Sequence, residues 1–445
     1  MRALALDAPV GARAVSDAKL EWLPGIIVVG AVCFNAGLAF VNGNVKELTP
    51  APVVACEIMF VGAAHLVALR NFKPQMTPWY ALLGLFAAFA VVRSLSSQTF
   101  DVKYLRDVMI IPTFVVLGMT FDARRLSRVV VAIQIVMLVF LVLEALDTQV
   151  YADLFKIMSY YINTRGYNAD DFWNKSSTLF VSATRPDDRF FILGDLHRLS
   201  SIFLEPVSLG NYCMVIVAYL CACYRELGTG TRWFLIVTTA MATIGCDGRL
   251  AMASTPLMVV CCALAPRLPR YSALIYIPGV TALAFVLVHF GHFEPGGDDF
   301  KGRIAHTVYL LTNYGMPEFL GLSDEFMSKA VDSGIAYLIT TQSIFVVVAI
   351  WATIVMAASE DRPDKTRFTH AVCIYIALNM MVSFALLTIK TAALLWFIYG
   401  SLQSRRAADG DGLAKLRRAG RRLGAPARIG RADELPIRAG SGSWA

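Results

Sequence analysis

Charged residues are scarce in this chain. Asp, Glu, Lys and Arg make up 16% of its 445 residues, whereas hydrophobic residues make up 57%. A typical soluble domain has about 25% charged residues and needs a largely polar surface to stay in solution. Apolar runs of roughly 16 to 22 residues recur along the chain, close to the ~20 residues that cross a hydrocarbon core as a helix. The composition therefore excludes an ordinary soluble enzyme and predicts an all-α, polytopic integral membrane protein.

Motifs for nucleotide and zinc chemistry are also missing. The sequence has no P-loop, no Rossmann glycine pattern, no HExxH and no CxxC pair, each of which has a defined role in phosphate or metal binding. Its nine cysteines lie almost all inside apolar runs, and none lies in a long polar segment. We interpret them as small apolar packing residues, and we expect neither a metal nor another cofactor.

Twelve apolar runs are predicted to span the membrane. They cover residues 22–41, 50–69, 79–96, 104–121, 127–146, 200–223, 232–247, 250–265, 271–290, 335–357, 369–387 and 390–402. Alternate short connections carry the basic residues, for example Arg70 with Lys73 and Arg124 with Arg125. Because basic residues favour the cytoplasmic side, both chain ends are expected there, and the two long polar segments are expected outside.

This orientation divides the chain into successive parts. They are a cytoplasmic N-terminus (1–21), spans one to five (22–146), a first large outer loop (147–199), spans six to nine (200–290), a second large outer loop (291–334), spans ten to twelve (335–402) and a basic cytoplasmic tail (403–445). The first loop is rich in aromatic residues, so we expect it to form an ordered lid at the interface. We expect the tail to be disordered and to attract anionic lipid rather than nucleic acid.

Charged residues at the outer ends of spans are the candidates for chemistry. The segment 197–212 reads HRLSSIFLEPVSLGNY. It puts Arg198 at the membrane edge and Glu205 about two helical turns deeper. A buried carboxylate needs a partner or a wet cavity. Glu205 is therefore half of a structural salt bridge with an arginine, a general base or a cation-binding group. His197 is a second candidate for the base.

Further segments bring basic residues to the outer face. Arg249 lies on a turn beside Gly248, where small residues allow close approach. Arg303 and His306 lie late in the second loop, and Lys390 lies between the last two spans. Outer basic residues go against the positive-inside rule and therefore need a reason. Because a guanidinium group matches phosphate oxygens bidentately, a diphosphate is a natural ligand for them.

These motifs together resemble those of a known family. The string RLSSIFLEP (198–206) followed by Gly210-Asn211 resembles a signature of bacterial polysaccharide polymerases of the Wzy type. More narrowly, it is similar to the xanthan kind of exopolysaccharide polymerase, within the superfamily that includes O-antigen ligases. Gly248-Arg249, Gly302-Arg303 and Asp332-Ser333-Gly334 resemble the later signatures in the same order. The resemblance covers roughly residues 195–345.

The resemblance implies a metal-independent glycosyltransferase of the bacterial inner membrane, with GT-C-like architecture and a periplasmic site. It would join undecaprenyl-diphosphate-linked oligosaccharide repeats into exopolysaccharide or O-antigen, with a chain-length regulator as a candidate partner. The expected site residues are Arg198, Arg249 and Arg303 on the diphosphate, a base among Glu205, His197 and His306, and substrate contacts from Asn211, Asp332 and Lys390. Asp332 could instead be a simple helix N-cap.

Two other functions share much of this pattern. A flippase or transporter of a lipid-linked or anionic glycan would also gather basic residues on its outer face. It would need charge across the bilayer, however, and the intramembrane charges are few: Glu57, His65, Glu144 and Glu205. An O-antigen ligase would share the chemistry, but no histidine here aligns with the catalytic-loop histidine of ligases. The polymerase is therefore the favoured hypothesis.

Overall fold

The computed structural model describes residues 10–98, 100–168, 170, 178–184, 189–191, 196–296 and 299–405. Every regular element in these residues is a helix, so the predicted all-α class is confirmed for the described part. The chain divides into two units, Met1–Arg405 and Arg406–Ala445. Apart from its first three residues, the basic tail predicted at 403–445 lies outside the described residues.

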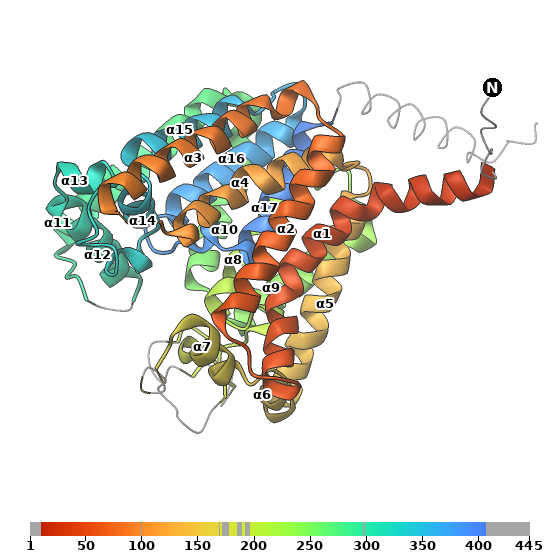
Figure 1. Cartoon of the computed structure of the whole chain (residues 1–445), viewed down its shortest axis with the longest axis horizontal. Coiled ribbons are helices and arrows are strands. Elements are labelled where there is room, and N and C mark those ends of the chain that lie inside the picture. The colour runs from red at the N-terminus through yellow and green to blue at the C-terminus, as the bar shows by residue number, and fades with distance from the viewer. Residues whose placement is uncertain are drawn as a thin grey trace, which may run out of the picture. The chain divides into compact units, whose positions relative to one another are not determined.

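The helices follow the predicted apolar runs (Figure 1). Before the first long polar segment they are α1 (Val10–Asn44), α2 (Pro50–Arg70), α3 (Thr77–Ser97), α4 (Val102–Thr120) and α5 (Leu126–Leu146). That segment begins with α6 (Thr148–Phe155) and α7 (Ile157–Arg165). Next come α8 (Pro206–Cys223), α9 (Thr229–Gly245), α10 (Arg249–Leu264) and α11 (Tyr276–Gly291). The second polar segment holds α12 (Phe300–Asn313) and α13 (Met316–Phe319), and the chain continues with α14 (Gly334–Thr341), α15 (Ile344–Met356), α16 (Pro363–Asn379) and α17 (Ile389–Gln403).

Among the described residues, seven helices are long and apolar enough to cross a membrane, or eight if the bent pair α14–α15 is one span. Apolar side chains are exposed on their outward faces. The clearest example is α11, which is almost entirely unburied and whose Phe290 is 75% exposed. Such faces suit contact with lipid tails and not with water. The fold is thus consistent with a polytopic membrane protein, while the count of twelve spans stays a prediction. The helices α9, α16 and α17 have only 17, 17 and 15 residues.

The centre of the helix bundle is formed by α4 and α17, which pack backbone to backbone. A Cβ atom added to Gly400 would lie 2.0 Å from the carbonyl oxygen of Val115, and one added to Gly118 would lie 2.2 Å from that of Phe397. All of α17 is buried, and Figure 1 shows it inside the bundle. Small residues at helix crossings allow this close approach in membrane proteins. A helix of only 15 residues is therefore buried along its whole length.

The predicted span 335–357 is a pair of bent helices in the structure. Helices α14 and α15 meet at 118°, at Ser343, whose φ is 152°. The buried Arg93 of α3 donates to the carbonyl oxygen of Thr340 at 2.7 Å and to that of Gly321. The guanidinium group therefore satisfies a carbonyl at the end of α14, which the break would otherwise leave without a partner. Hydropathy does not detect such a break because both halves are apolar.

Two other predicted spans are shifted. The run 200–223 becomes helical only at Pro206, after a short 3₁₀ turn, because proline suits the first position of a helix. The run 369–387 begins earlier, at Pro363, and its α-helix ends at Asn379. In both cases the non-helical stretch lies beside the pocket described below. The irregular backbone therefore lies at the candidate site.

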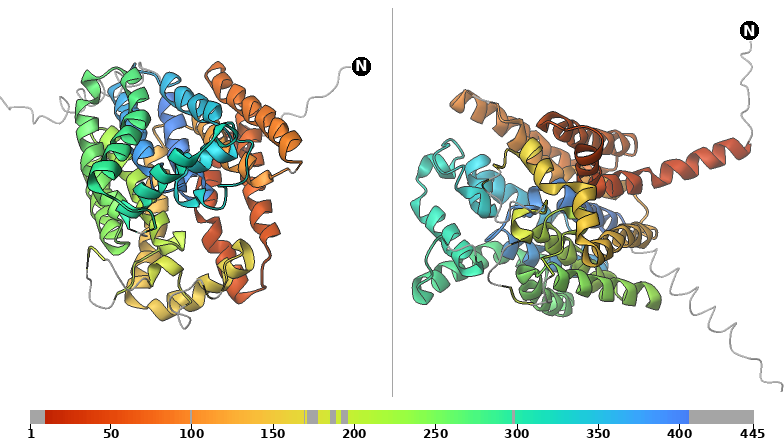
Figure 2. Two further views of the ribbon diagram at one scale, coloured as in Figure 1. Left: turned by 90° about the vertical axis from the view of Figure 1, so that its left-hand side faces the viewer. Right: turned by 90° about the horizontal axis from the view of Figure 1, so that it is seen from below.

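The two ends of the bundle carry different groups. The helices α6 and α7 lie across one end, where Lys156 donates to the carbonyl oxygen of Gly43 at 2.8 Å (left panel of Figure 2). Past the other end of α8, Glu226 pairs with Arg362 at 2.7 Å and also with Arg405. An ion-paired cluster thus closes one end, and the polar segment 147–199 begins at the other. Phe172 and Trp173, part of its predicted aromatic lid, lie outside the described residues.

Candidate functional site

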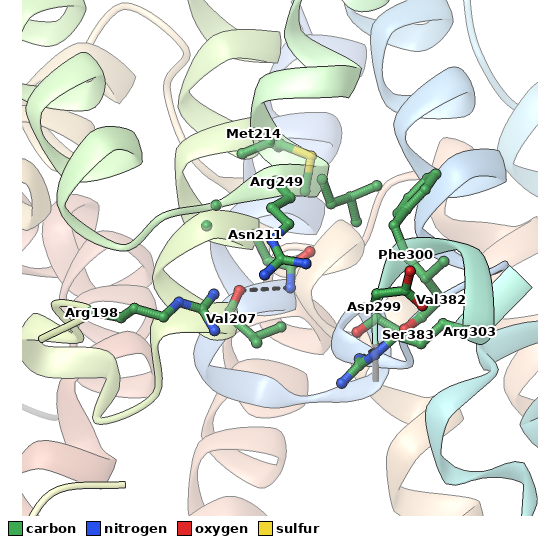
Figure 3. A pocket seen from close by; sticks show the side chains of 14 residues that line it. Arg198, Val207, Asn211, Met214, Arg249, Asp299, Phe300, Arg303, Val382 and Ser383 are labelled. Carbon is green, nitrogen blue, oxygen red and sulfur yellow. Dashed lines mark hydrogen bonds between the residues drawn. The ribbon is translucent and has the colours of Figure 1, made fainter. Parts of the chain in front are cut away.

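The three arginines singled out by the sequence line one pocket. Arg198, Arg249 and Arg303 come from separate parts of the chain and surround a cavity of about 100 Å³ (Figure 3). We call it the arginine pocket. Its other walls come from the first turns of α8, from the turn between α9 and α10, and from Val382 and Ser383 after α16. The structure therefore brings these three arginines together, and the outer side of the membrane on which they were expected stays a prediction.

Three helices begin at the arginine pocket. Val207 and Asn211 lie in the first turns of α8, Arg249 is the first residue of α10, and Phe300 is the first residue of α12. The N-terminus of a helix carries partial positive charge and unpaired N–H groups, which favour an anion. Guanidinium groups and helix N-termini thus act in the same direction. The electrostatics of the pocket suit a phosphate-containing group.

Arg198 also fastens the surrounding loops. Its Nε donates to the carbonyl oxygen of Cys246 at 3.1 Å, and its two terminal nitrogens donate to those of Ser182 and Asp247, both at 3.3 Å. The same turn accepts from the other side, because the buried Asp247 carboxylate receives the N–H group of Phe190 at 3.1 Å. Arg198 therefore stands in a fixed position at the edge of the pocket.

The turn before Arg249 contacts α8 at two glycines. Gly248 precedes Arg249, and a Cβ atom added to Gly210 of α8 would lie 3.6 Å from the Cα atom of Gly248. The turn between α9 and α10 therefore rests against the first turns of α8. Both glycines belong to the motifs noted in the sequence, and the expected close approach at Gly248 is confirmed.

Arg303 faces the pocket from α12. It donates to the carbonyl oxygen of Val382 at 3.3 Å and lies 3.8 Å from a carboxylate oxygen of the exposed Asp332. Asp332 does not line the pocket. The N-cap of α14 is Ser333, whose Oγ accepts from the N–H group of Ala336 at 3.3 Å. The alternative role of Asp332 as this N-cap is therefore wrong.

Asn211 lines the pocket and links α8 to α16. Its Oδ1 accepts from the Tyr375 hydroxyl at 3.0 Å and from Nδ2 of Asn379 at 2.6 Å. Its own Nδ2 donates to the carbonyl oxygen of Val207 at 2.9 Å. These bonds hold the side chain in one orientation. Asn211 is thus a buried link at the wall of the pocket, as well as a predicted contact to the substrate.

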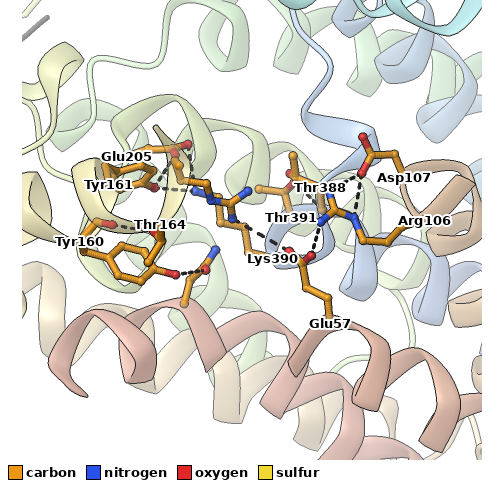
Figure 4. Close-up of polar contacts among 12 residues, drawn as sticks. Glu57, Arg106, Asp107, Tyr160, Tyr161, Thr164, Glu205, Thr388, Lys390 and Thr391 are labelled. Carbon is orange, nitrogen blue, oxygen red and sulfur yellow. Dashed lines mark hydrogen bonds and ion pairs between the residues drawn. The ribbon is translucent and has the colours of Figure 1, made fainter. Parts of the chain in front are cut away.

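Glu205 and Lys390 lie outside the arginine pocket, in a separate buried cluster (Figure 4). Their side chains pair at 2.9 Å. Glu205 also accepts from Ser208 at 2.6 Å and from the Tyr161 phenol. Burial, reinforced by Glu205, raises the pKa of Tyr161 well above its ordinary value, so the phenol remains a donor. The structure thus favours the salt-bridge role for Glu205, with lysine as the partner in place of the expected arginine.

Lys390 was expected to close the ring of cations and does not. Its ammonium group is buried and donates to the carbonyl oxygen of Phe203 at 3.1 Å. A second set of charges is drawn with it in Figure 4: Arg106 pairs with Asp107 at 2.7 Å and with Glu57. Buried charges at membrane depth need such partners. The Arg106–Glu57 pair joins α4 to α2, and the Lys390–Glu205 pair joins α17 to the segment before α8. Neither pair was recognised in the sequence, because its partners are far apart along the chain.

The two histidines considered as bases are also outside the pocket. Nε2 of His306 lies 2.8 Å from the carbonyl oxygen of Lys329. Nε2 of His197 lies 2.9 Å from the carboxylate of Glu144, which is completely buried at the end of α5. The other oxygen of Glu144 accepts the N–H groups of Ser200 and Ser201 at 2.8 and 2.7 Å. Glu144 therefore fixes the backbone on the C-terminal side of Arg198.

A second, larger cavity adjoins the arginine pocket along α10. It encloses about 810 Å³ and has mainly apolar walls from α8, α9 and α10, including Leu220, Ile236 and Val259. Ala251 of α10 lines the arginine pocket, and the next residue, Met252, lines this larger cavity. We call it the apolar groove. The arginine pocket and the larger apolar groove thus share one helix.

Comparisons with known proteins found no match. No model of a protein family, no curated protein and no solved structure matches it. Within the described residues, no group of three or more His, Cys, Asp or Glu side chains is placed to hold a metal ion. Function is therefore argued from the residues and geometry of the site.

Proposed function

We propose that this protein is a polymerase that joins lipid-diphosphate-linked oligosaccharide repeats at the periplasmic face of the bacterial inner membrane. The observation that carries the proposal is the arginine pocket, where Arg198, Arg249 and Arg303 from three distant segments meet at three helix N-termini. The resemblance of the motifs around these arginines to those of Wzy-type polymerases supplies the reaction class.

The arginines would stabilise the leaving group. In the transfer, an acceptor hydroxyl attacks the anomeric carbon of the first sugar, and the bond from that carbon to the diphosphate breaks. Negative charge grows on the diphosphate as this bond breaks. Guanidinium groups fixed in advance, as Arg198 is by backbone carbonyls, stabilise such charge without reorganising.

The apolar groove would hold the lipid part of the same substrate. It adjoins the arginine pocket on α10 and is about eight times larger in volume, with about 810 against about 100 Å³. A polyprenyl chain attached to a diphosphate needs apolar surface beside the anion site. Because the groove lies between helices of a membrane protein, the lipid would enter it without crossing water.

The orientation belongs to the proposal. The basic residues of alternate short connections and of the start of the tail, such as Arg362 and Arg405 at the ion-paired end, support a cytoplasmic position for that end. Both chain termini would then be cytoplasmic and twelve helices would cross the membrane. The arginine pocket would open to the periplasm, where the repeat units are presented.

Reconstitution tests the proposal directly. The purified protein in lipid vesicles receives an undecaprenyl-diphosphate-linked repeat unit and no nucleotide. The expected products are a ladder of longer glycans and free undecaprenyl diphosphate. Movement of intact lipid across the vesicle membrane without a ladder would support a flippase instead. Transfer only to lipid A core would support a ligase, and folded protein with no ladder contradicts the polymerase function.

A further inference from the structure

Asp299 is a carboxylate in the arginine pocket that the sequence motifs did not single out. It lies at the start of α12, one turn before Arg303, and its Oδ1 accepts the N–H group of Gly302 at 2.8 Å. Among the described residues that line this pocket, it is the only acid. In Figure 3 it lies on the same side as Arg303, with Arg249 between it and Arg198. Capping the helix engages one oxygen of the carboxylate, which has a second, Oδ2.

The charges of the pocket fit the substrate class. Three guanidinium groups and one carboxylate give the described lining residues a net charge of +2. The diphosphate that joins a lipid to a sugar is a diester and carries two negative charges. The ligand's two negative charges therefore balance those of the described lining residues. An ionised carboxylate beside the reacting sugar can accept a proton, which neither the arginines nor Asn211 can do.

We propose that Asp299 is the general base of the transfer, an assignment that rests on the polymerase function proposed above. The acceptor hydroxyl gives its proton to Oδ2 of Asp299 while its oxygen bonds to the anomeric carbon of the donor sugar. The bond from that carbon to the diphosphate breaks, and its electron pair stays on the diphosphate beside the arginines. One proton and one glycosyl group move, and no further reactant is needed.

Position separates Asp299 from the earlier candidates. A base must reach the hydroxyl within hydrogen-bond distance, and carboxylates commonly fill this role in reactions at anomeric carbons. Glu205 is engaged by Lys390 and Ser208 in another cluster, and His197 is engaged by Glu144. Asp299 is in the same small cavity as the three arginines.

The variant Asp299→Asn separates the chemical role from the structural one. Asparagine caps a helix about as well as aspartate, so α12 keeps its N-cap, but an amide is not a base. We expect the rate of glycan elongation to fall about a hundred- to ten-thousand-fold, while undecaprenyl diphosphate binds equally well or more tightly. Asp147→Asn is the matched control, because Asp147 caps α6 by accepting the N–H group of Val150 at 3.0 Å, as Asp299 caps α12, but it lies outside the pocket. Its elongation rate should be unchanged.

The outcomes distinguish this assignment from the polymerase function. A wild-type ladder with an unchanged rate in Asp299→Asn overturns the base role and leaves the polymerase function intact. The absence of a ladder from folded wild-type protein overturns the polymerase function itself. Equal losses of rate and of affinity for undecaprenyl diphosphate in Asp299→Asn make the residue a binding group and overturn the proposal. A glycosyl adduct on Asp299, detected by mass spectrometry, makes it a nucleophile and also overturns the proposal.

Discussion

Replacing Arg249 by alanine should weaken the binding of a lipid diphosphate without disturbing the fold. Arg249 is the first residue of α10, so truncating its side chain leaves the backbone N–H groups of the helix start in place. The loss is then that of a charge-assisted hydrogen bond, about 1.5–3 kcal/mol. Since about 1.4 kcal/mol corresponds to a tenfold change in Kd, the expected weakening is about 10- to 150-fold. Arg249→Lys should recover little of it, because an ammonium group cannot reproduce the bidentate guanidinium fork.

The assay is a titration of purified protein in lipid nanodiscs with undecaprenyl diphosphate. Arg232→Ala is the matched control: Arg232 is also a partly buried arginine in the first turn of a helix, but it lies over Tyr224 and outside the arginine pocket. Its Kd should equal that of the wild type. An unchanged Kd in Arg249→Ala, or the same weakening in both variants, would refute the reasoning.

Three further changes test the supports of the site. Glu144→Gln leaves an amide where two backbone N–H groups and a histidine meet. It should lower the free energy of unfolding by about 1–3 kcal/mol and weaken diphosphate binding. An unchanged Kd would show that Glu144 does not position Arg198. Gly400→Val should prevent insertion or lower the unfolding temperature sharply, because a Cβ atom there meets a backbone oxygen at 2.0 Å; Gly84→Val, which meets no atom within 4 Å, should not. Ala240→Trp, at the wall of the apolar groove, should weaken binding of undecaprenyl diphosphate but not of a short-chain analogue, and equal effects would remove the lipid from the groove.

The positions of helices could be predicted because lipid-facing and buried helices are both apolar. Hydropathy therefore found α11, whose outward face is exposed, and α17, whose whole length is buried. It could not find the break at Ser343 or the end of α16 at Asn379, because backbone direction is decided there by packing and by partners such as Arg93. A run of apolar residues indicates burial in lipid or in protein, but it does not indicate where a helix bends.

The candidate site was predictable in part. Arg198, Arg249 and Arg303 stood out because each is basic on the side where basic residues are disfavoured. That Lys390 turns toward Glu205 could not be predicted, since the direction of a side chain on a helix depends on neighbours that are distant in sequence. Asp299 was not predicted as a site residue. It reads as an ordinary N-cap, and only the fold places it beside the arginines.

The most direct test of the account is a structure of the protein bound to undecaprenyl diphosphate in nanodiscs. The account predicts the two phosphates between Arg198, Arg249 and Arg303, with nitrogen-to-oxygen distances of about 2.7–2.9 Å, and the prenyl chain along α10 in the apolar groove. Phosphates bound instead at the Glu205–Lys390 cluster, or anywhere away from the three arginines, would contradict it.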